Sequence, residues 1–297
     1  MNFLINLFSN KYKSSWQSHY FSATIDCMTE QNGFKYSILA SGSTGNSFYL
    51  ETPKKKILVD AGLSGKKIES LLSEIDRDIH DIDALLITHE HSDHIKGIGV
   101  LARKYGIDLY ANEDTWSELD SKNALGKIPV EQKHLFEMGK TMTFGDIDIE
   151  SFGVSHDAIA PQFYRFMKDN KSFVMLTDTG YVSDRMRGTI ENADAYLMES
   201  NHDIEILRMG AYPWRTKQRI LSDQGHLSNE DGAEAAFSIH GNKTKRIFLG
   251  HLSLNNNIKE LAHLTMDGYL QQHDVDTKKD LKILDTSHEH ASQLYDI

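Results

Sequence analysis

Apolar and polar residues follow regular periods through most of the chain after residue 34. Lys35–Ala40 alternates with a period of two, which predicts a strand. Apolar residues at 68, 71, 72 and 75 recur with helical spacing and predict a helix over 64–75. The same criteria predict strands at 48–51, 56–60, 84–88 and 108–111 and further helices over 95–105 and 113–121. Strands that alternate with helices in this way are typical of an α/β fold.

The pattern changes to paired strands in the middle of the chain. Residues 140–155 alternate on both sides of Gly145-Asp146, which predicts a hairpin. Strands at 163–167 and 173–176 flank Asp169-Asn170 and predict a second one. The last elements that the pattern predicts are helices over 183–192, 203–221, 229–240 and 257–272 and strands at 195–199, 246–250 and 281–284.

Neither an internal repeat nor a linker divides the chain, so we expect one domain over residues 34–297. Residues 1–33 have no clear period and are rich in Ser, Asn, Lys and aromatic residues. We interpret them as a weakly ordered N-terminal extension. Met28 lies just before the patterned part of the chain, which makes it a candidate for the natural start.

The composition is that of a soluble globular protein, because 39% of the 297 residues are hydrophobic and 25% are charged. No apolar run is long enough to predict a membrane span. The single cysteine, Cys27, excludes internal disulfides and cysteine-based zinc sites and fits a cytoplasmic protein. The net charge of -11 argues against a broad nucleic-acid-binding surface and leaves a local basic patch open. The best candidates for such a patch are Arg208, Arg215, Lys217 and Arg219, for which a solvated helix face is the stronger interpretation.

Three histidines and two acids fall within the seven residues 88–94. This segment follows an apolar run at 84–87 and precedes a helical pattern, so it lies at the carboxyl end of a strand, where α/β proteins bind ligands. His89 and His91 alternate and can point to one place, whereas Asp93 and His94 can reach a second place nearby. Imidazole and carboxylate together suit divalent Zn, Mn or Fe. The segment therefore predicts a metal site.

Four further acids or histidines end or follow apolar strands, namely Asp60, His156, Asp178 and His251. Because such strand ends gather at one edge of a sheet, we expect them beside the histidine segment. One divalent ion would then be held by His89, His91 and His156, a second by Asp93, His94 and His251, and Asp178 could bridge both. A pair of ions about 3.5–4 Å apart can clamp the attacking and leaving oxygens of a displacement. A histidine bonded to backbone is the alternative for His156 or His251 taken alone.

The ordered set of these residues resembles the metallo-β-lactamase superfamily, over roughly residues 35–285. The resemblance implies a four-layer αββα sandwich with a dinuclear site at the sheet edges, and it implies that Asp60 supports the metal ligands from behind. The closer similarity is to the YycJ (WalJ) group of bacterial hydrolases, through residues 39–46, 59–63, 199–203 and 225–229. Members of that group are associated with nuclease, phosphodiesterase-like and exonuclease activity, so the resemblance implies DNA as the substrate.

Three other branches of the superfamily fit less well. Flavodiiron oxygen reductases replace the second histidine of the motif with a carboxylate and add a flavodoxin domain, whereas His91 is retained here and no room for that domain remains. Nucleases with a β-CASP insertion need a longer segment than the one between Asp178 and His251. The true β-lactamases use a cysteine or other ligands at the second site and are secreted.

Two histidines outside the metal set are catalytic candidates, together with Asp93. His226 precedes the helix over 229–240, whose N-terminal N–H groups favour an anion, so a bound phosphate could receive a proton from it. His202 lies in another loop of the second half. A structural or surface histidine is the alternative for both. The polar turn with Ser43, Thr44 and Asn46 could face the site or be only structural, and we interpret the remaining histidines, 19, 80, 134, 240, 263, 273, 288 and 290, as surface residues.

We therefore expect a cytoplasmic dinuclear metal-dependent hydrolase, a phosphodiesterase or exonuclease-like nuclease that acts on DNA through a metal-bound hydroxide. Two alternatives remain open. One is a thioesterase or lactonase of the same fold, and the other is a metal-binding regulator without turnover. The sequence specifies neither the metal nor the oligomeric state.

Overall fold

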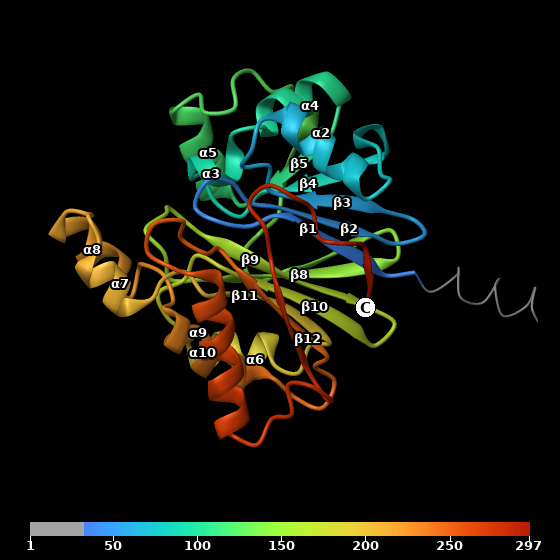
Figure 1. Ribbon diagram of the computed structural model, residues 1–297. Coiled ribbons are helices and arrows are strands. Elements are labelled where there is room, and N and C mark those ends of the chain that lie inside the picture. Colours follow the sequence, from blue (N-terminus) through green and yellow to red (C-terminus); the bar gives the residue numbers. More distant parts are fainter. Residues whose placement is uncertain (1–32) are drawn as a thin grey trace, which may run out of the picture.

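Two seven-stranded sheets lie face to face between two layers of helices in residues 33–297, the part of the chain that the computed structural model describes (Figure 1). Helices from the first half of the chain cover the outer face of one sheet, and helices from the second half cover the other. The predicted four-layer αββα sandwich is confirmed. The interpretation of residues 1–33 as an extension, and of Met28 as the start, lies outside the described residues except for Gly33.

The first sheet combines strands from the first half of the chain with the C-terminal strand, in the order β14-β1-β2-β3-β4-β5-β6. Its pairs are antiparallel from β14 to β3 and parallel from β3 to β6. The strands are β1 (Lys35–Ala40), β2 (Ser47–Glu51), β3 (Lys56–Val59), β4 (Ala84–Leu86), β5 (Asp108–Ala111), β6 (Lys133–Leu135) and β14 (Tyr295–Asp296).

The second sheet has the order β13-β12-β11-β10-β9-β8-β7. It repeats the plan of the first, with parallel pairs from β13 to β10 and antiparallel pairs from β10 to β7. The strands are β7 (Thr141–Phe144), β8 (Ile147–Gly153), β9 (Gln162–Lys168), β10 (Lys171–Leu176), β11 (Ala195–Glu199), β12 (Arg246–Gly250) and β13 (Lys282–Asp285).

Helices cover the two outer faces, and two short ones, α7 and α8, lie beside the layers at the left of Figure 1. The helices are α2 (Gly65–Glu74), α3 (Ser92–Ile95), α4 (Ile98–Tyr105), α5 (Glu113–Ser121), α6 (Asp184–Ile190), α7 (Ile204–Met209), α8 (Trp214–Ile220), α9 (Asn229–Ile239) and α10 (Lys259–Gln272), with 3-10 turns at Ile79–Asp81 and Val130–Gln132. Among the described residues, no helix combines the length and apolar character that crossing a membrane requires.

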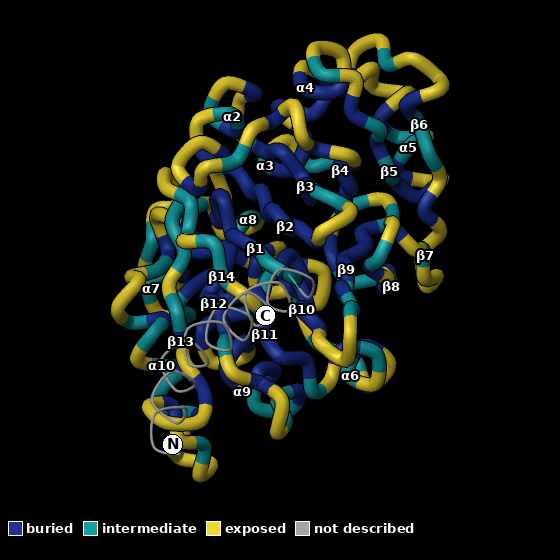
Figure 2. Tube along the Cα trace, turned by 90° about the vertical axis from the view of Figure 1, so that its right-hand side faces the viewer, coloured by how far each residue is buried: buried dark blue, intermediate teal, exposed yellow. Residues whose placement is uncertain are grey.

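Alternate residues of each strand enter different cores, as the two-residue repeat of a strand requires. In β1, Ile38 packs between the two sheets, whereas Leu39 packs against the outer helices. Aromatic rings join the sheets, since the Phe173 ring centre lies 4.5 Å from that of Tyr36 and 4.7 Å from that of Phe48. Figure 2 shows the result, with strands buried and most turns exposed.

The structure differs from the predicted elements where tertiary contacts compete with the local pattern. The helix expected over 95–105 is two helices, α3 and α4, with a break at Gly97. The Gly97 amide donates to the Ala61 carbonyl (2.7 Å), and a Cβ at Gly97 would lie 2.4 Å from the Leu63 oxygen. The loop after β3 therefore packs into the break. The short strands β6 and β14 were not predicted, because they are formed by pairing with β5 and β1.

Candidate metal centre

Polar segments follow the carboxyl ends of strands that run in one direction within each sheet. In the first sheet these strands are β1, β3 and β4, and in the second they are β8, β10, β11 and β12. The segments after β3, β4, β8, β10 and β12 carry the predicted site residues, which are Asp60, His89, His91, Asp93, His94, His156, Asp178 and His251. Residues far apart in sequence thus meet where the edges of the two sheets face each other.

Three of these residues have a left-handed backbone within two residues of the ends of their strands. The φ angles are 57° for Asp60, 52° for Asp178 and 53° for His251. Residues other than glycine rarely adopt this conformation, and it costs of order 1–3 kcal/mol. The surrounding structure therefore stabilises a costly backbone conformation at three strand ends of one site.

The first group that could hold a metal consists of His89, His91 and His156. Nδ1 of His91 lies 3.1 Å from Nε2 of His89 and 3.2 Å from Nε2 of His156. The opposite nitrogens are already engaged, because Nδ1 of His89 lies 3.0 Å from the Thr88 hydroxyl and Nδ1 of His156 lies 3.1 Å from the Gly225 carbonyl. These contacts hold two of the three rings from outside, so that their Nε2 atoms are left for a shared metal ion.

The second group consists of Asp93, His94, Asp178 and His251. Nε2 of His94 lies 3.4 Å from Oδ2 of Asp178, and Nε2 of His251 lies 3.3 Å from Oδ1 of the same carboxylate. Asp178 also faces the first group, since its Oδ1 lies 3.9 Å from Nε2 of His156. Asp178 Oδ2 is buried and has no hydrogen-bond partner among the described residues. A buried oxygen without a hydrogen bond is costly, and a cation beside this carboxylate would offset that cost.

The carboxylates within the site favour a positive charge beside them. Burial lowers the pKa of His89 well below its usual range, which keeps this ring neutral as a ligand must be. Burial raises the pKa of Asp178, but His251 and His94 outweigh it and hold that pKa well below its usual range. Burial likewise lowers the pKa of His251, but the Asp178, Asp93 and Glu199 carboxylates raise it to about 10. Asp178 is therefore ionised at neutral pH.

Asp60 lies behind the second group and belongs to none of the groups that could hold a metal. Its Oδ2 accepts hydrogen bonds from Nδ1 of His94 (2.7 Å) and from the Thr88 hydroxyl (2.7 Å), and its Oδ1 accepts from the Thr88 amide (2.9 Å). Asp60 therefore fixes which nitrogen of His94 faces the site. The support of metal ligands that the resemblance implies for Asp60 stays a prediction.

Glu199 is a site residue to which the sequence analysis assigned no role. It is fully buried at the end of β11, and its Oε1 lies 2.8 Å from Nδ1 of His226 and 3.0 Å from Nδ1 of His251. Its Oε2 accepts from the Thr179 and Leu227 amides. Burial raises its pKa, but His226 and His251 outweigh burial and lower it to about 2. The signal that would have found Glu199 is the one that found Asp60, an acid at the end of an apolar strand.

The structure separates the two histidines that were candidates outside the metal set. His226 lines the site cavity, with its ring centre 4.9 Å from that of His156 and 5.0 Å from that of His251. His202 is buried, does not line the cavity and contacts Oδ1 of Asn201 through Nδ1 (3.3 Å). Burial lowers the pKa of His202 to about 4. A catalytic role for His202 stays a prediction that its position does not favour.

The polar turn between β1 and β2 reaches the site. Asn46 donates through its side-chain Nδ2 to Oδ2 of Asp93 (3.3 Å). The backbone N–H of Asn46 donates to the Asp93 backbone carbonyl (2.8 Å). Ser43 lines the site cavity, and Thr44 lines the cavity beside it. Gly62 permits this close approach, because a Cβ there would lie 1.6 Å from the Asp93 carbonyl oxygen.

The basic residues over 208–219 do not form one patch. Lys217 is buried, and its Nζ donates to the carbonyls of Arg208 (2.7 Å) and Gly210 (2.6 Å), which ties α8 to the end of α7. Arg208 pairs with Glu205 on its own helix. Arg219 lines the site cavity and pairs with Asp157 at 2.7 Å. The predicted solvated helix face is therefore wrong for Lys217.

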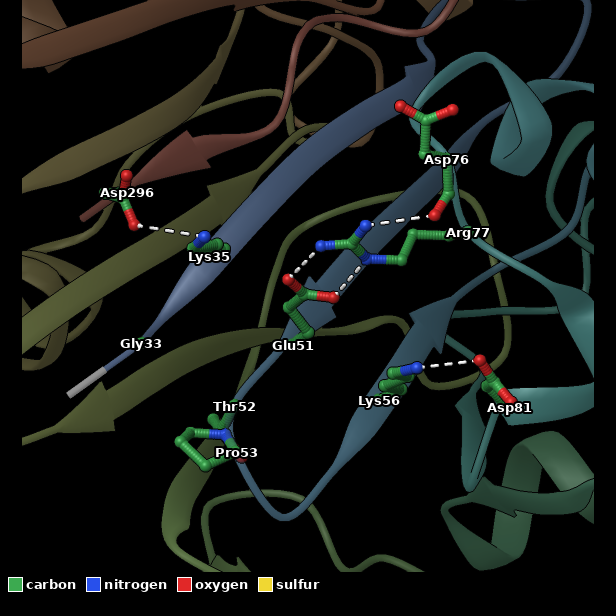
Figure 3. Close-up of a pocket in the computed structure, with 10 residues that line it drawn as sticks. All are labelled: Gly33, Lys35, Glu51, Thr52, Pro53, Lys56, Asp76, Arg77, Asp81 and Asp296. Atoms are coloured by element: carbon green, nitrogen blue, oxygen red, sulfur yellow. Dashed lines mark hydrogen bonds and ion pairs between the residues drawn. The ribbon is translucent and has the colours of Figure 1, made fainter. Parts of the chain in front are cut away.

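The cavity over the two groups is small, about 180 Å³, and its lining includes His226, Tyr212 and Arg219 besides the predicted ligands. A larger hollow, about 570 Å³, lies between β1, β2 and the turn after α2 (Figure 3). Its charged side chains pair with one another, as Arg77 does with Glu51 (2.5 Å) and Lys56 with Asp81 (2.8 Å). Members of both ligand groups line the smaller cavity, which is therefore the candidate site.

Comparison with known proteins identifies the family of this chain. Residues 55–252, more than half of the chain, match the family described as "Beta-lactamase superfamily domain". The chain belongs to the beta-lactamase superfamily. Among superfamily members, it is 72% identical over 265 residues to the "Exodeoxyribonuclease WalJ" of Streptococcus pneumoniae serotype 2 (strain D39 / NCTC 7466), covering 89% of this chain and 98% of that protein. The predicted similarity to the YycJ (WalJ) group is confirmed.

Two further proteins show how far the similarity extends. The "Exodeoxyribonuclease YycJ" of Bacillus anthracis is 53% identical over 262 residues, which cover 84% of this chain and 98% of that protein. The solved structure of the metallo-beta-lactamase fold protein YhfI from Bacillus subtilis matches with a TM-score of 0.65 at 15% identity, covering 88% of this chain and 99% of that one. At that identity the match supports the fold alone.

Proposed function

We propose that this protein is a metal-dependent exodeoxyribonuclease, a phosphodiesterase that acts at the ends of DNA in the cytoplasm. The observation that carries the proposal is the buried Asp178 carboxylate, which belongs to one ligand group, lies 3.9 Å from His156 of the other, and has one oxygen without a hydrogen bond among the described residues. The substrate class comes from the relatives at 72% and 53% identity, which are named as exodeoxyribonucleases. The single cysteine of the sequence agrees with a cytoplasmic location.

Two divalent ions are part of the proposal. His89, His91 and His156 would hold one, Asp93, His94 and His251 would hold the other, and Asp178 would contact both. When bound, such a pair supplies an activated water and stabilises the charge on the phosphate oxygens. Nitrogen and carboxylate ligands of this kind accept Zn, Mn or Fe.

The side chains of the protein prepare the reaction in two ways. Asp60 holds Nδ1 of His94, and Glu199 holds Nδ1 of His251, so that each ring presents Nε2 to the ligand group. Glu199 also holds Nδ1 of His226, which leaves Nε2 of that ring for the substrate. A proton on this nitrogen is available to the oxygen that leaves phosphorus when the phosphodiester is cleaved.

One preparation tests the proposal by metal analysis and a substrate panel. We expect about two divalent ions per chain, mononucleotide release from labelled DNA, hydrolysis of bis-p-nitrophenyl phosphate, and loss of both activities after chelation. Hydrolysis of thioesters or lactones in place of phosphodiesters would contradict the proposal and support the alternative enzyme class. Full metal content without any turnover would instead support a regulator.

A further inference from the structure

A second cavity adjoins the candidate metal centre. Its volume is about 690 Å³, against about 180 Å³ for the cavity over the ligand groups, and Ser253 lines both. The turn after β1 separates them, because it contributes Ser43 to the site cavity and Thr44 to the larger one. The volume lies within the range of about 300–1,000 Å³ that is typical of small-ligand sites.

The lining of this second cavity combines two lysines and a histidine with apolar groups. Lys67, Lys259 and His288 line it, with Glu289 as the acidic residue, while Leu252 and Leu254 provide apolar surface. Lys259 is exposed and forms no ion pair with the described residues, and Nζ of Lys67 donates to the Glu289 carbonyl (2.6 Å). Nδ1 of His288 is buried without a hydrogen-bond partner among those residues. Cations beside apolar surface suit a nucleotide, which carries phosphate next to a sugar and a base.

The C-terminal segment lines the cavity and is connected to the metal centre by hydrogen bonds. After β13, in the second sheet, the chain passes to the first sheet and ends beside β1 (dark red in Figure 1). On the way, the Ser287 carbonyl accepts from the Ser41 amide (3.0 Å), and the Ser41 hydroxyl accepts from the His251 amide (2.8 Å). The His288 ring packs on Gly42 so closely that a Cβ there would lie 1.9 Å from it. His288 is thus half-buried, which corrects its interpretation as a surface residue.

We propose that this cavity binds the terminal nucleotide of a DNA strand while the adjoining phosphodiester lies at the metal centre. Lys67, Lys259 and His288 contact the terminal phosphate, and Leu252 and Leu254 contact the sugar and base. The inference rests on the proposed function and deepens it, because it explains why cleavage begins at an end of the strand. It applies to a 5′-phosphate or a 3′-phosphate, which share one chemistry and which the experiment distinguishes.

The test compares two double variants of the metal-loaded protein with the same change in charge. Lys67→Ala with Lys259→Ala removes both cavity lysines, whereas Lys66→Ala with Lys279→Ala removes two exposed lysines that do not line the cavity. The substrates are oligonucleotides with a 5′-phosphate, a 3′-phosphate or neither, and bis-p-nitrophenyl phosphate as a diester without a terminal nucleotide. Binding of thymidine 3′,5′-bisphosphate is measured in parallel.

The cavity variant should raise KM at least about tenfold for one of the two phosphorylated ends, since hydrogen bonds to charged groups contribute about 1.5–3 kcal/mol each. It should leave kcat on bis-p-nitrophenyl phosphate unchanged, and the control variant should change neither. An equal effect in both variants, or none in the cavity variant, overturns the inference while the proposed function stands. If the wild type cleaves no phosphodiester, the proposed function fails. In that case, binding of thymidine bisphosphate that is lost in the cavity variant would still support nucleotide recognition by this cavity. Binding that is unchanged in the cavity variant would overturn the inference.

Discussion

Oε1 of Glu199 lies 2.8 Å from Nδ1 of His226, and the same oxygen lies 3.0 Å from Nδ1 of His251. One buried carboxylate therefore orients a proposed metal ligand and the proposed proton donor together. Both rings depend on it for their tautomer, because a carboxylate can only accept from their N–H groups. This relationship separates Glu199 from Asp60, which orients His94 in the ligand set.

Replacing Glu199 should therefore affect metal binding and proton transfer at once. In Glu199→Gln an amide N–H faces groups that need an acceptor, so we expect metal affinity to fall about 10–100-fold, the usual effect of losing such a partner. The rate at saturating metal should fall as well, because His226 loses its orientation. Glu191→Gln, at an exposed position, is the matched control. Wild-type metal affinity and rate in Glu199→Gln would contradict this role.

His226→Ala should separate proton donation from metal binding. The variant should keep both metals, and its rate on DNA should fall on the order of 10²–10⁴-fold, the range for losing one positioned proton donor. The loss should be smaller for p-nitrophenyl esters, whose leaving group needs little protonation. Equal losses on both substrates with metal retained would identify His226 as a phosphate-binding residue, and no loss would make it structural.

Asp178→Ala should remove metal as well as activity. Because its carboxylate faces both ligand groups, we expect loss of roughly half or more of the bound metal. Metal content per chain, measured after dialysis, checks this. Asp184→Ala is the control, since that side chain is 97% exposed and lies outside the site. Full metal content with normal turnover in Asp178→Ala would rule out the shared ligand.

Metal binding should strengthen as the pH rises. Without metal, the Asp178, Asp93 and Glu199 carboxylates overcome burial and raise the pKa of His251 to about 10, against about 6.5 in an unfolded chain. Its contribution to the stability of the metal-free protein is therefore complete below about pH 6.5 and is lost as the pH rises toward 10. A metal needs the neutral ring, so binding releases a proton. Calorimetric titration in two buffers of different ionisation enthalpy should detect that proton, and a metal affinity that does not change from about pH 7 to pH 9 would refute the prediction.

Two glycine substitutions should change stability in opposite directions. Gly62→Ala places a Cβ 1.6 Å from the Asp93 carbonyl oxygen, so the free energy of unfolding should fall by about 1–3 kcal/mol or more. Gly268→Ala, within α10, meets no atom within 4 Å and should raise it by about 0.5–1 kcal/mol. Denaturant titration of both variants measures the difference. A neutral Gly62→Ala would show that the loop before α2 moves freely away from the metal centre.

Most strands and helices could be predicted from the sequence because burial on one or both faces imposes a period on the residues themselves. Helix α5 coincides with the predicted helix over 113–121, and β1, β5, β11 and β12 coincide with predicted strands. The short strand β14 could not be predicted in this way. Its two residues carry too little pattern, and only pairing with β1 gives them a strand conformation.

The sequence by itself determined which residues are candidates for the metal centre, since acids and histidines at the ends of apolar strands must gather at a sheet edge. Only the tertiary structure decided which of these side chains meet, because that depends on how two sheets pack across a shared core. It brought Glu199 between His226 and His251 and buried His202 away from the cavity. It also buried Lys217, because the carbonyls that its ammonium group satisfies come from another helix end, which no local period along the chain encodes.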